Sequence, residues 1–157
     1  MDSTKRHSKK FFTVEEANQR LPLVRAVVDD IVRLFRDVHE RRQRLAEIRE
    51  IPGAELRSND DAYSEELDQA ERKLDKDIIQ LEEHVDELKE LEIELKDPIM
   101  GLIDFPTIID GREAYLCWKL GEKEVAFWHD LDAGFRGRQA LLETPVSIDD
   151  EESSGDL

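Results

Sequence analysis

Residues able to bind a metal ion gather late in the chain, in and just before the segment EVAFWHDLDAGFRGRQ. His129 lies there beside Asp130 and Asp132, and Glu122 precedes the segment. Imidazole and carboxylate groups are ligands for a divalent metal ion, so these four residues are candidate metal ligands. The spacing His-Asp-x-Asp is not an established ligand motif, which favours a structural alternative. In that alternative the aspartates cap a turn and His129 hydrogen-bonds to them.

The same segment contains two arginines beside glycines, Arg136 and Arg138. Glycine allows the backbone to turn its amides toward an anion, and a guanidinium group binds carboxylate or phosphate through a planar fork. The segment lacks the length and the lysine of a phosphate-binding P-loop. Both arginines are therefore candidate ligand-binding residues for a small anion, and pairing with the surplus acidic side chains is the favoured alternative.

Cys117 is the only cysteine in the sequence, which excludes an internal disulfide and is typical of a reducing cytoplasm. A cysteine and a histidine can form a nucleophilic pair or share a metal ion. The strand register predicted below puts Cys117 and His129 on opposite faces of a sheet, so we expect a small buried cysteine. Asp104 is predicted to lie directly opposite Cys117, and both join the candidate ligand-binding residues.

Two long helices are predicted ahead of this segment. Thr13 with Glu16 fits a capping box, and Pro22 indicates a kink or a second helix start. Heptad-spaced apolar residues follow in both helices: Val24, Val28, Ile31, Phe35 and Val38 in the first, and Leu67, Leu74, Leu81, Leu88 and Leu95 in the second, which Pro98 ends. Because the linker is short, residues 11–97 are expected to form a long, coiled-coil-like antiparallel helical hairpin.

Beyond the hairpin, in residues 98–141, we expect a small antiparallel sheet and a motif loop. Apolar residues recur there with a period of two, which predicts a meander of three strands at 102–109, 113–119 and 124–129. Asp110-Gly111 is a type I′ turn signal, and Gly121-Glu122 marks the second turn. The predicted fold class is therefore α+β, a helical hairpin followed by a three-stranded antiparallel meander.

The two turns also predict which side chains face the helices. In this register Phe127 and His129 point toward the helices and Trp128 toward the opposite face. A bulge or a three-residue loop would invert a strand, because one residue of slip moves every side chain to the other face. Pro106 is the expected place for such a bulge.

The 157-residue chain has a formal net charge of −16. A surface of this sign repels nucleic acids and anionic membranes, so neither is an expected partner. No run approaches the roughly 20 apolar residues of a membrane span, and we expect a cytoplasmic protein. Residues 1–10 and the acidic residues 142–157 are predicted to be disordered extensions.

Three stretches together resemble a bacterial family catalogued as domain of unknown function 2203: FFTVEEANQRLP, ELKDPIMGLIDFP and GREAYLCWKLGEKEVAFWHDLDAGFRGRQ. The resemblance covers roughly residues 11–141 and implies no established activity. It makes the matching motif positions characteristic of the family: Asp104, Cys117, Trp118, Glu122, Trp128, His129, Gly134, Phe135 and Arg138.

These observations favour a non-enzymatic interaction or scaffold protein that forms a homodimer or docks a protein partner through its hairpin. The alternative is a protein that binds a divalent metal or a small anion in the turn 129–138, with enzymatic activity left open. A third hypothesis is a regulator whose acidic tail mimics nucleic acid.

Overall fold

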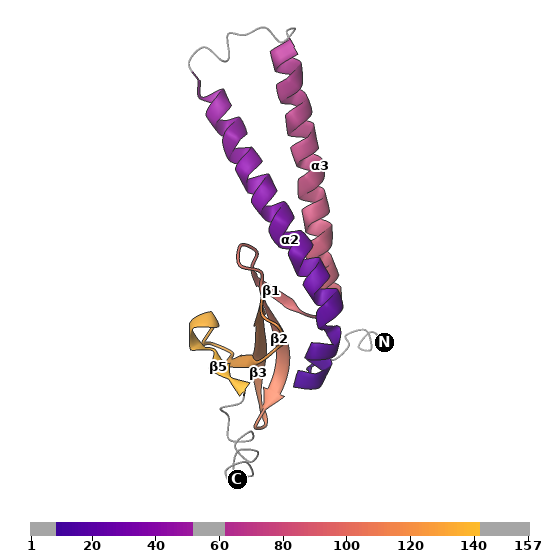
Figure 1. Ribbon diagram of the computed structural model, residues 1–157, viewed down its shortest axis with the longest axis vertical. Helices are drawn as coiled ribbons and strands as arrows, with labels where there is room; N and C mark the ends of the chain where they lie inside the picture. The colour runs from indigo at the N-terminus through magenta and orange to yellow at the C-terminus, as the bar shows by residue number, and fades with distance from the viewer. Residues whose placement is uncertain (1–8, 52–61, 142–157) are drawn as a thin grey trace, which may run out of the picture.

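The computed structural model describes residues 9–51 and 62–141. Two long helices, α2 (Val14–Arg49) and α3 (Ala62–Glu90), form a hairpin, and a sheet packs beside its lower half (Figure 1). The predicted disordered tail, most of the predicted leader and most of the linker lie outside the described residues. Two residues of that leader are described, and the backbone amide of Lys10 donates to Glu92 at 3.0 Å.

Helix α2 begins at the predicted cap. Thr13 Oγ1 accepts a hydrogen bond from the Glu16 amide at 3.0 Å, and Glu16 Oε1 accepts one from the Thr13 amide at 3.0 Å. Pro22 lies inside this single continuous helix and does not begin a second one. Four of the five predicted seam residues of α2 are buried, Val24, Val28, Ile31 and Val38, whereas Phe35 is only partly buried.

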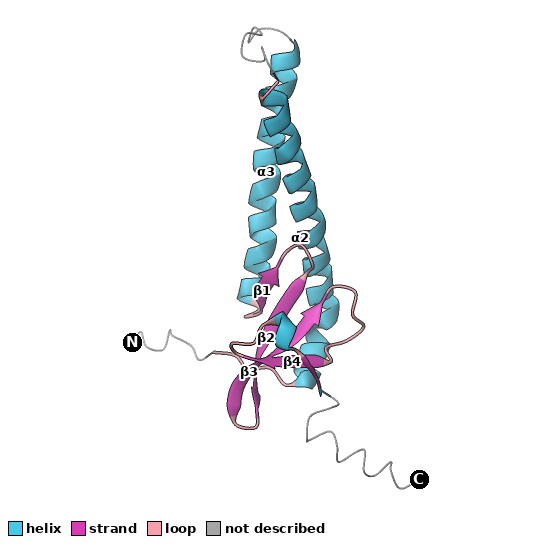
Figure 2. Ribbon diagram, turned by 90° about the vertical axis from the view of Figure 1, so that its left-hand side faces the viewer, coloured by secondary structure: helices cyan, strands magenta, loops and turns pink. Residues whose placement is uncertain are grey.

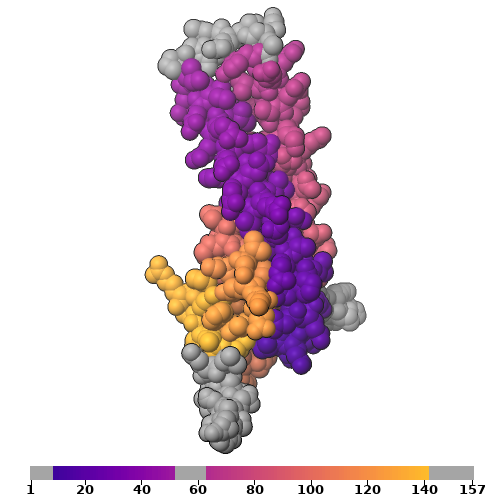
Figure 3. All heavy atoms as spheres, in the orientation of Figure 1, coloured from indigo at the N-terminus to yellow at the C-terminus, as the bar shows by residue number. Residues whose placement is uncertain are grey.

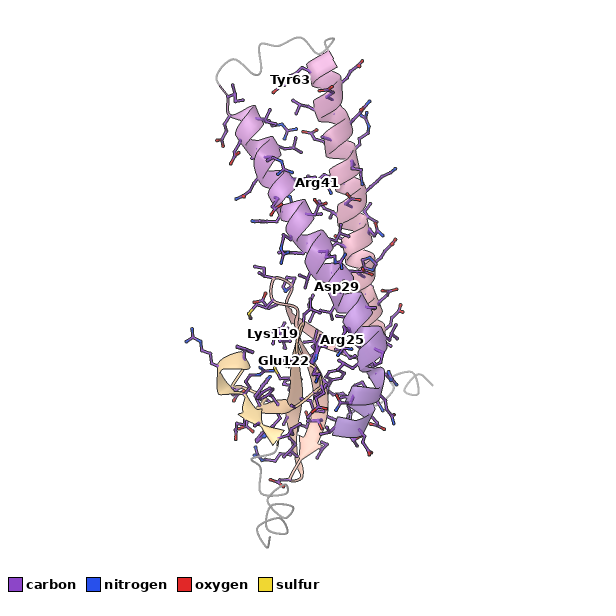
Figure 4. All side chains as sticks on the ribbon, in the orientation of Figure 1. Arg25, Asp29, Arg41, Tyr63, Lys119 and Glu122 are labelled. Atoms are coloured by element: carbon purple, nitrogen blue, oxygen red, sulfur yellow. The ribbon has the colours of Figure 1, made fainter. Side chains whose placement is uncertain are left out.

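The two helices run antiparallel, as predicted. Arg41 of α2 pairs with Asp77 of α3, and Arg49, farther along α2, pairs with Glu71, which comes earlier in α3. Figure 4 shows Arg41 between the two helices. The half of the hairpin that carries these pairs extends beyond the sheet (Figures 1 and 3). We call this half, residues 38–49 and 62–78, the arm.

Helix α3 ends at Glu90, so the prediction that it continues to Pro98 is wrong. Glu92 has a φ of 65°, a left-handed conformation that a helix cannot continue through. Leu95 keeps the heptad spacing of the helix but belongs to a strand, β1 (Glu94–Asp97). An apolar residue at that position suits a half-buried strand as well as a helix, so the heptad spacing alone does not distinguish the two.

The sheet has five antiparallel strands in the order β1-β2-β3-β4-β5, and the prediction of three was too few. After β1 come β2 (Leu102–Ile109), β3 (Arg112–Lys119), β4 (Phe127–Asp130) and β5 (Gln139–Ala140). A short 3-10 turn, η2 (Phe135–Gly137), separates the last two. The two strands that were missed are the edge strands, which are too short to show a period in the sequence. Figure 2 shows the strands across the foot of the hairpin.

The first hairpin of the sheet is confirmed in detail. Asp110 and Gly111 have φ of 52° and 77°, as a type I′ turn requires. Asp104 pairs with Cys117, and Pro106 pairs with Tyr115 in an unbroken ladder. The bulge expected at Pro106 is therefore absent from the β2–β3 ladder, and an irregularity occurs instead in β1, between Leu95 and Asp97.

The second connection of the sheet differs from the prediction by one residue. Leu116 pairs with Trp128 and Cys117 with Phe127, whereas a two-residue loop would have paired Leu116 with Phe127. A slip of one residue reverses the facing of the whole strand. Trp128 therefore faces the helices, and Phe127 and His129 face the other way. The predicted facing of all three residues is wrong.

The core lies between the sheet and helix α2. The helix-facing side chains of the sheet, among them Phe105, Leu116 and Trp118, are fully buried with Val28 and Ile31. The Trp118 indole donates to the Glu122 carbonyl at 3.1 Å. The arm has a separate small core of Val38, Leu45 and Leu74. Within the described ranges, no helix is long and apolar enough to cross a membrane.

Gly101 is required where the β1–β2 turn meets α2. Its φ is +70°, and a Cβ there would lie 2.8 Å from Leu120 Cβ and 3.0 Å from Val32 Cγ2. Gly101→Ala is expected to lower the free energy of unfolding by about 2 kcal/mol, from left-handed strain and overpacking. The control is Gly111→Ala, with a φ of +77° and no such neighbours within 4 Å. Equal losses for the two variants in urea unfolding would contradict the steric argument.

Asp77 should make the arm sensitive to acid. Hydrogen bonds from Arg41 and Lys73 hold the pKa of Asp77 below its usual value. A carboxylate with a lowered pKa stabilises the fold above its unfolded pKa, and this contribution disappears as the pH falls below about 4. Asp77→Asn is expected to lower the free energy of unfolding by about 1 kcal/mol at pH 7. It should also make that free energy depend less on pH between 7 and 3. The exposed Asp75→Asn is the control; a similar loss there would refute a specific role for Asp77.

Candidate metal centre

One row of paired residues crosses all five strands on the face of the sheet away from the helices. The row consists of Glu94, Asp104, Cys117, Phe127 and Ala140, each directly paired with the next. Because directly paired residues point to the same face, all five side chains are on this side of the sheet. His129, two residues after Phe127, shares the face. The one-residue slip in the second connection therefore brings His129 to the same side as Cys117.

Asp104, Cys117 and His129 form a compact buried cluster. Their ligand atoms, a carboxylate oxygen, a sulfur and a ring nitrogen, all lie within 4.8 Å of one another. Their exposed fractions are 2%, 0% and 2%. They come from the central parts of β2, β3 and β4, so rigid paired strands hold them. We call these three residues the Asp–Cys–His cluster.

The hydrogen bonds of His129 determine where its lone pair points. Nδ1 lies 2.8 Å from the carbonyl oxygen of Asp130, which can only accept, so Nδ1 must carry a proton. In the neutral ring the lone pair is therefore on Nε2, which lies 3.0 and 3.1 Å from the two carboxylate oxygens of Asp104. A lone pair and a carboxylate at this distance need a cation between them, either a proton or a metal ion.

Burial governs the protonation of the other two members. It raises the pKa of Asp104, an effect that the charge and hydrogen bond of His129 oppose. Burial also raises the pKa of the Cys117 thiol to about 11, against the lowering effect of Arg138. Without a bound cation the thiol is protonated at neutral pH. It is therefore not the activated thiolate that a catalytic cysteine needs.

Tyr115 closes the cluster on the β1–β2 side. Its ring is tilted by 45° against the His129 ring, with 5.4 Å between centroids. Its hydroxyl donates to Glu94 Oε2 at 3.0 Å, and Glu94 in turn pairs with Lys96 at 2.9 Å. Burial and the hydrogen bond to Glu94 raise the pKa of Tyr115. The tyrosine is thus fixed as a neutral hydrogen-bond donor above the imidazole.

Arg138 closes the cluster on the β4–β5 side. Its guanidinium group donates to the two oxygens of Glu122 at 2.7 and 2.9 Å, the planar fork expected of arginine and carboxylate. It stacks 4.0 Å from the centroid of the Phe127 ring and 4.7 Å from that of Phe135. One of its nitrogens also lies 3.5 Å from the Cys117 carbonyl oxygen.

Residues 10–141 match the family described as "Uncharacterized conserved protein (DUF2203)". The chain belongs to the DUF2203 family. The match includes all three members of the Asp–Cys–His cluster. No curated protein and no solved structure matches the chain, so the chemistry of this DUF2203 protein is interpreted from its own geometry.

The residues predicted as metal ligands are not brought together in this DUF2203 protein. Glu122 binds Arg138, and Asp130 pairs through its carboxylate with Arg112 at 2.8 Å. Asp132 is exposed on the turn. His129 alone of the four contributes to the buried cluster. The candidate site is therefore on the sheet face, outside the 129–138 turn except for His129 itself.

The predicted ligand-binding residues divide in the same way. Asp104 and Cys117 do lie opposite each other and form the cluster with His129. Arg136 is exposed, whereas Arg138 is paired with Glu122, as the favoured alternative for these arginines anticipated. The expectation that Cys117 is buried is confirmed. Its predicted separation from His129 is wrong, because it depended on the two-residue loop.

Burial and protonation should make Cys117 unreactive in the metal-free DUF2203 protein. At pH 8 we expect it to react with a disulfide reagent at least about 100-fold more slowly than a free thiol, because the thiolate is the nucleophile. In guanidinium chloride the same chelator-treated sample should titrate one thiol per chain, the number in the sequence. Rapid reaction of the folded protein would show that the thiol is accessible and would contradict this prediction.

Proposed function

We propose that this protein binds one divalent transition metal ion, of the Zn²⁺ class, through Asp104, Cys117 and His129. The observation that carries the proposal is the orientation of His129. The Asp130 carbonyl fixes its Nδ1 proton, which aims Nε2 at the Asp104 carboxylate with the Cys117 sulfur within 4.8 Å. A ligating histidine that donates its other N–H to a backbone carbonyl is the usual arrangement in metal sites.

The charges of the ligands fit a divalent ion. A thiolate and a carboxylate together balance two positive charges, so the loaded cluster is neutral, which suits its burial. Sulfur, nitrogen and oxygen ligands in one site are typical of Zn²⁺, whereas Ca²⁺ and Mg²⁺ take oxygen ligands. Metal bonds of about 2.0–2.3 Å place ligand atoms roughly 3.5 Å apart, so loading would shorten the longest separation, at most 4.8 Å, by up to about 1.3 Å and would slightly widen the 3.0 Å between His129 Nε2 and Asp104.

The site supports a structural or storage role better than catalysis. Three protein ligands leave one tetrahedral position, which in a catalytic site is open to water and substrate. Here all three residues are at most 2% exposed. A metal bound to β2, β3 and β4 would crosslink the centre of the sheet.

Metal analysis of the full chain tests the proposal. The protein, produced without a histidine tag, should contain about one zinc per chain. After chelation it should take up Co²⁺ with the near-ultraviolet absorption of a cobalt–thiolate bond. Cys117→Ser should lose that absorption. A wild-type protein that binds neither ion at micromolar concentration would refute the proposal.

We propose separately that the helical hairpin of α2 and α3 forms a coiled-coil homodimer with a second copy in the cytoplasm. What supports this is the small core of the arm together with exposed charges of opposite sign. Exposed arginines, Arg36, Arg42 and Arg44, lie on α2, and exposed acids, Glu82, Glu83 and Asp86, lie on α3. Ile79 of α3 is 56% exposed between them. Light scattering should give twice the chain mass, and Ile79→Lys should halve it; a monomeric wild type would refute the dimer.

A further inference from the structure

The segment 131–141, which follows β4 and contains η2 and β5, contacts the Asp–Cys–His cluster through Arg138, and we call it the strap. The strap lies on the side of the sheet away from α2 (Figure 1). Its backbone hydrogen bonds are mostly local: Ala133 to Asp130, Gly137 to Gly134, and Arg138 to Phe135. Residues 131–134 are exposed, and β5 pairs with β4 through only two residues. The β5 ladder and the hydrogen bond from the Leu141 amide to the Ala126 carbonyl attach the end of the strap, so residues 131–138 depend on side chains for attachment.

Arg138 is the side chain that attaches the strap most firmly. It is bound by the fork to Glu122, which comes from the β3–β4 connection, and it is stacked between Phe127 and Phe135. The side chains of Arg138 and Glu122 are only 14% and 21% exposed. Glu122 is itself held, because its Oε1 accepts the Lys119 amide at 2.9 Å. Figure 4 labels Glu122 and Lys119 together at the sheet.

The same guanidinium group reaches the Cys117 ligand. One nitrogen is 3.5 Å from the Cys117 carbonyl oxygen. Arg138 thus contacts the backbone of Cys117 from the strap.

We propose that Arg138, held by Glu122, is a positioning residue that keeps the strap over Cys117 and sets the rate at which the bound metal ion exchanges. This inference rests on the proposed metal-binding function. Arg138 touches the ligand residue and does not bind the metal. Its positive charge beside the Cys117 backbone would favour a metal-bound thiolate, and outer partners of this kind typically alter metal affinity or activity by about 10–100-fold.

Lysine cannot replace this arginine. A single ammonium group cannot form two parallel hydrogen bonds to Glu122 and stack on two phenyl rings at the same time. Arg138→Lys keeps the charge and removes the fork, whereas Glu122→Gln keeps an acceptor and removes its charge. The matched control is Arg136→Lys, since Arg136 is an exposed arginine on the same strap.

The test is a chelator challenge of the cobalt-loaded full chain. Release is followed as the loss of cobalt–thiolate absorption after excess EDTA is added. Arg138→Lys and Glu122→Gln should each bind one cobalt and release it about 10–100-fold faster than wild type. Arg136→Lys should release it at the wild-type rate. Equal rates for wild type and Arg138→Lys, or an equally fast Arg136→Lys, would overturn the role of Arg138.

Two further results keep the test decisive. If the wild-type protein takes up no cobalt, the proposed metal function fails before Arg138 is tested. If the variants do not fold, hydrogen–deuterium exchange of the wild type replaces them. Cobalt loading should then slow amide exchange in residues 135–141, and unchanged exchange there would overturn the proposal.

Discussion

Alanine at His129 is expected to leave the purified protein without stoichiometric metal. The substitution removes one of three protein ligands and the only nitrogen donor of the cluster. A ligand present at 1,000 times its dissociation constant stabilises the folded state by about 4 kcal/mol. His129→Ala should therefore lose that increment in addition to the cost of the cavity. Metal content and urea unfolding, each measured with and without added zinc, give both quantities.

The control for this variant is His84→Ala. His84 is a partly buried histidine of α3 whose ring lies 3.5 Å from Glu87 and which is not a member of the cluster. Its removal should leave the metal content at one per chain and change the unfolding free energy by less than about 1 kcal/mol. If His129→Ala retains its zinc, or if His84→Ala loses it, the assignment of the site is wrong.

Asp104→Ala is expected to destabilise even the metal-free protein by about 3 kcal/mol. Removing one member of a buried, hydrogen-bonded pair leaves the other unpaired, and such losses are about 3–5 kcal/mol. The pair between Asp104 and His129 has side chains 2% and 3% exposed.

A double-mutant cycle separates this effect from simple loss of packing. Replacing both Asp104 and His129 with leucine removes both polar groups, so the double variant should be more stable than Asp104→Leu alone in the absence of metal. Denaturant unfolding after chelator treatment gives the free energies of the four proteins in the cycle: the wild type, the two single leucine variants and the double variant. A coupling energy near zero would mean that the two side chains do not interact as a pair.

Local patterns in the sequence predict most of the fold. The cap at Thr13, the antiparallel hairpin and the type I′ turn at Asp110-Gly111 are each determined by residues a few positions apart. The pairing of Asp104 with Cys117 follows from that turn by counting, and the structure confirms it. Two of the three cluster members, Asp104 and Cys117, could therefore be placed side by side from the sequence.

The position of His129, the third member of the cluster, could not be predicted in this way, because contacts between residues far apart in the sequence fix the β3–β4 connection. Asn18 of α2 accepts a hydrogen bond from the Val125 amide at 2.7 Å, and Arg25 donates to the Lys123 carbonyl at 3.1 Å. A turn motif in the local sequence does not indicate hydrogen bonds to residues so far away in the chain. One clue was present, since Trp128 is the largest side chain of the strand and would be costly to leave outside the core.

The anchor between Asn18 and Val125 has a consequence for how the protein is made. The two residues are 107 positions apart, so the strand that carries His129 acquires its register only after the first turns of α2 have docked. Contacts of such high sequence separation form late, because a long loop must close first. During synthesis the cluster would thus be completed after nearly the whole domain has left the ribosome. Metal loading would then serve as the final, post-translational step of folding.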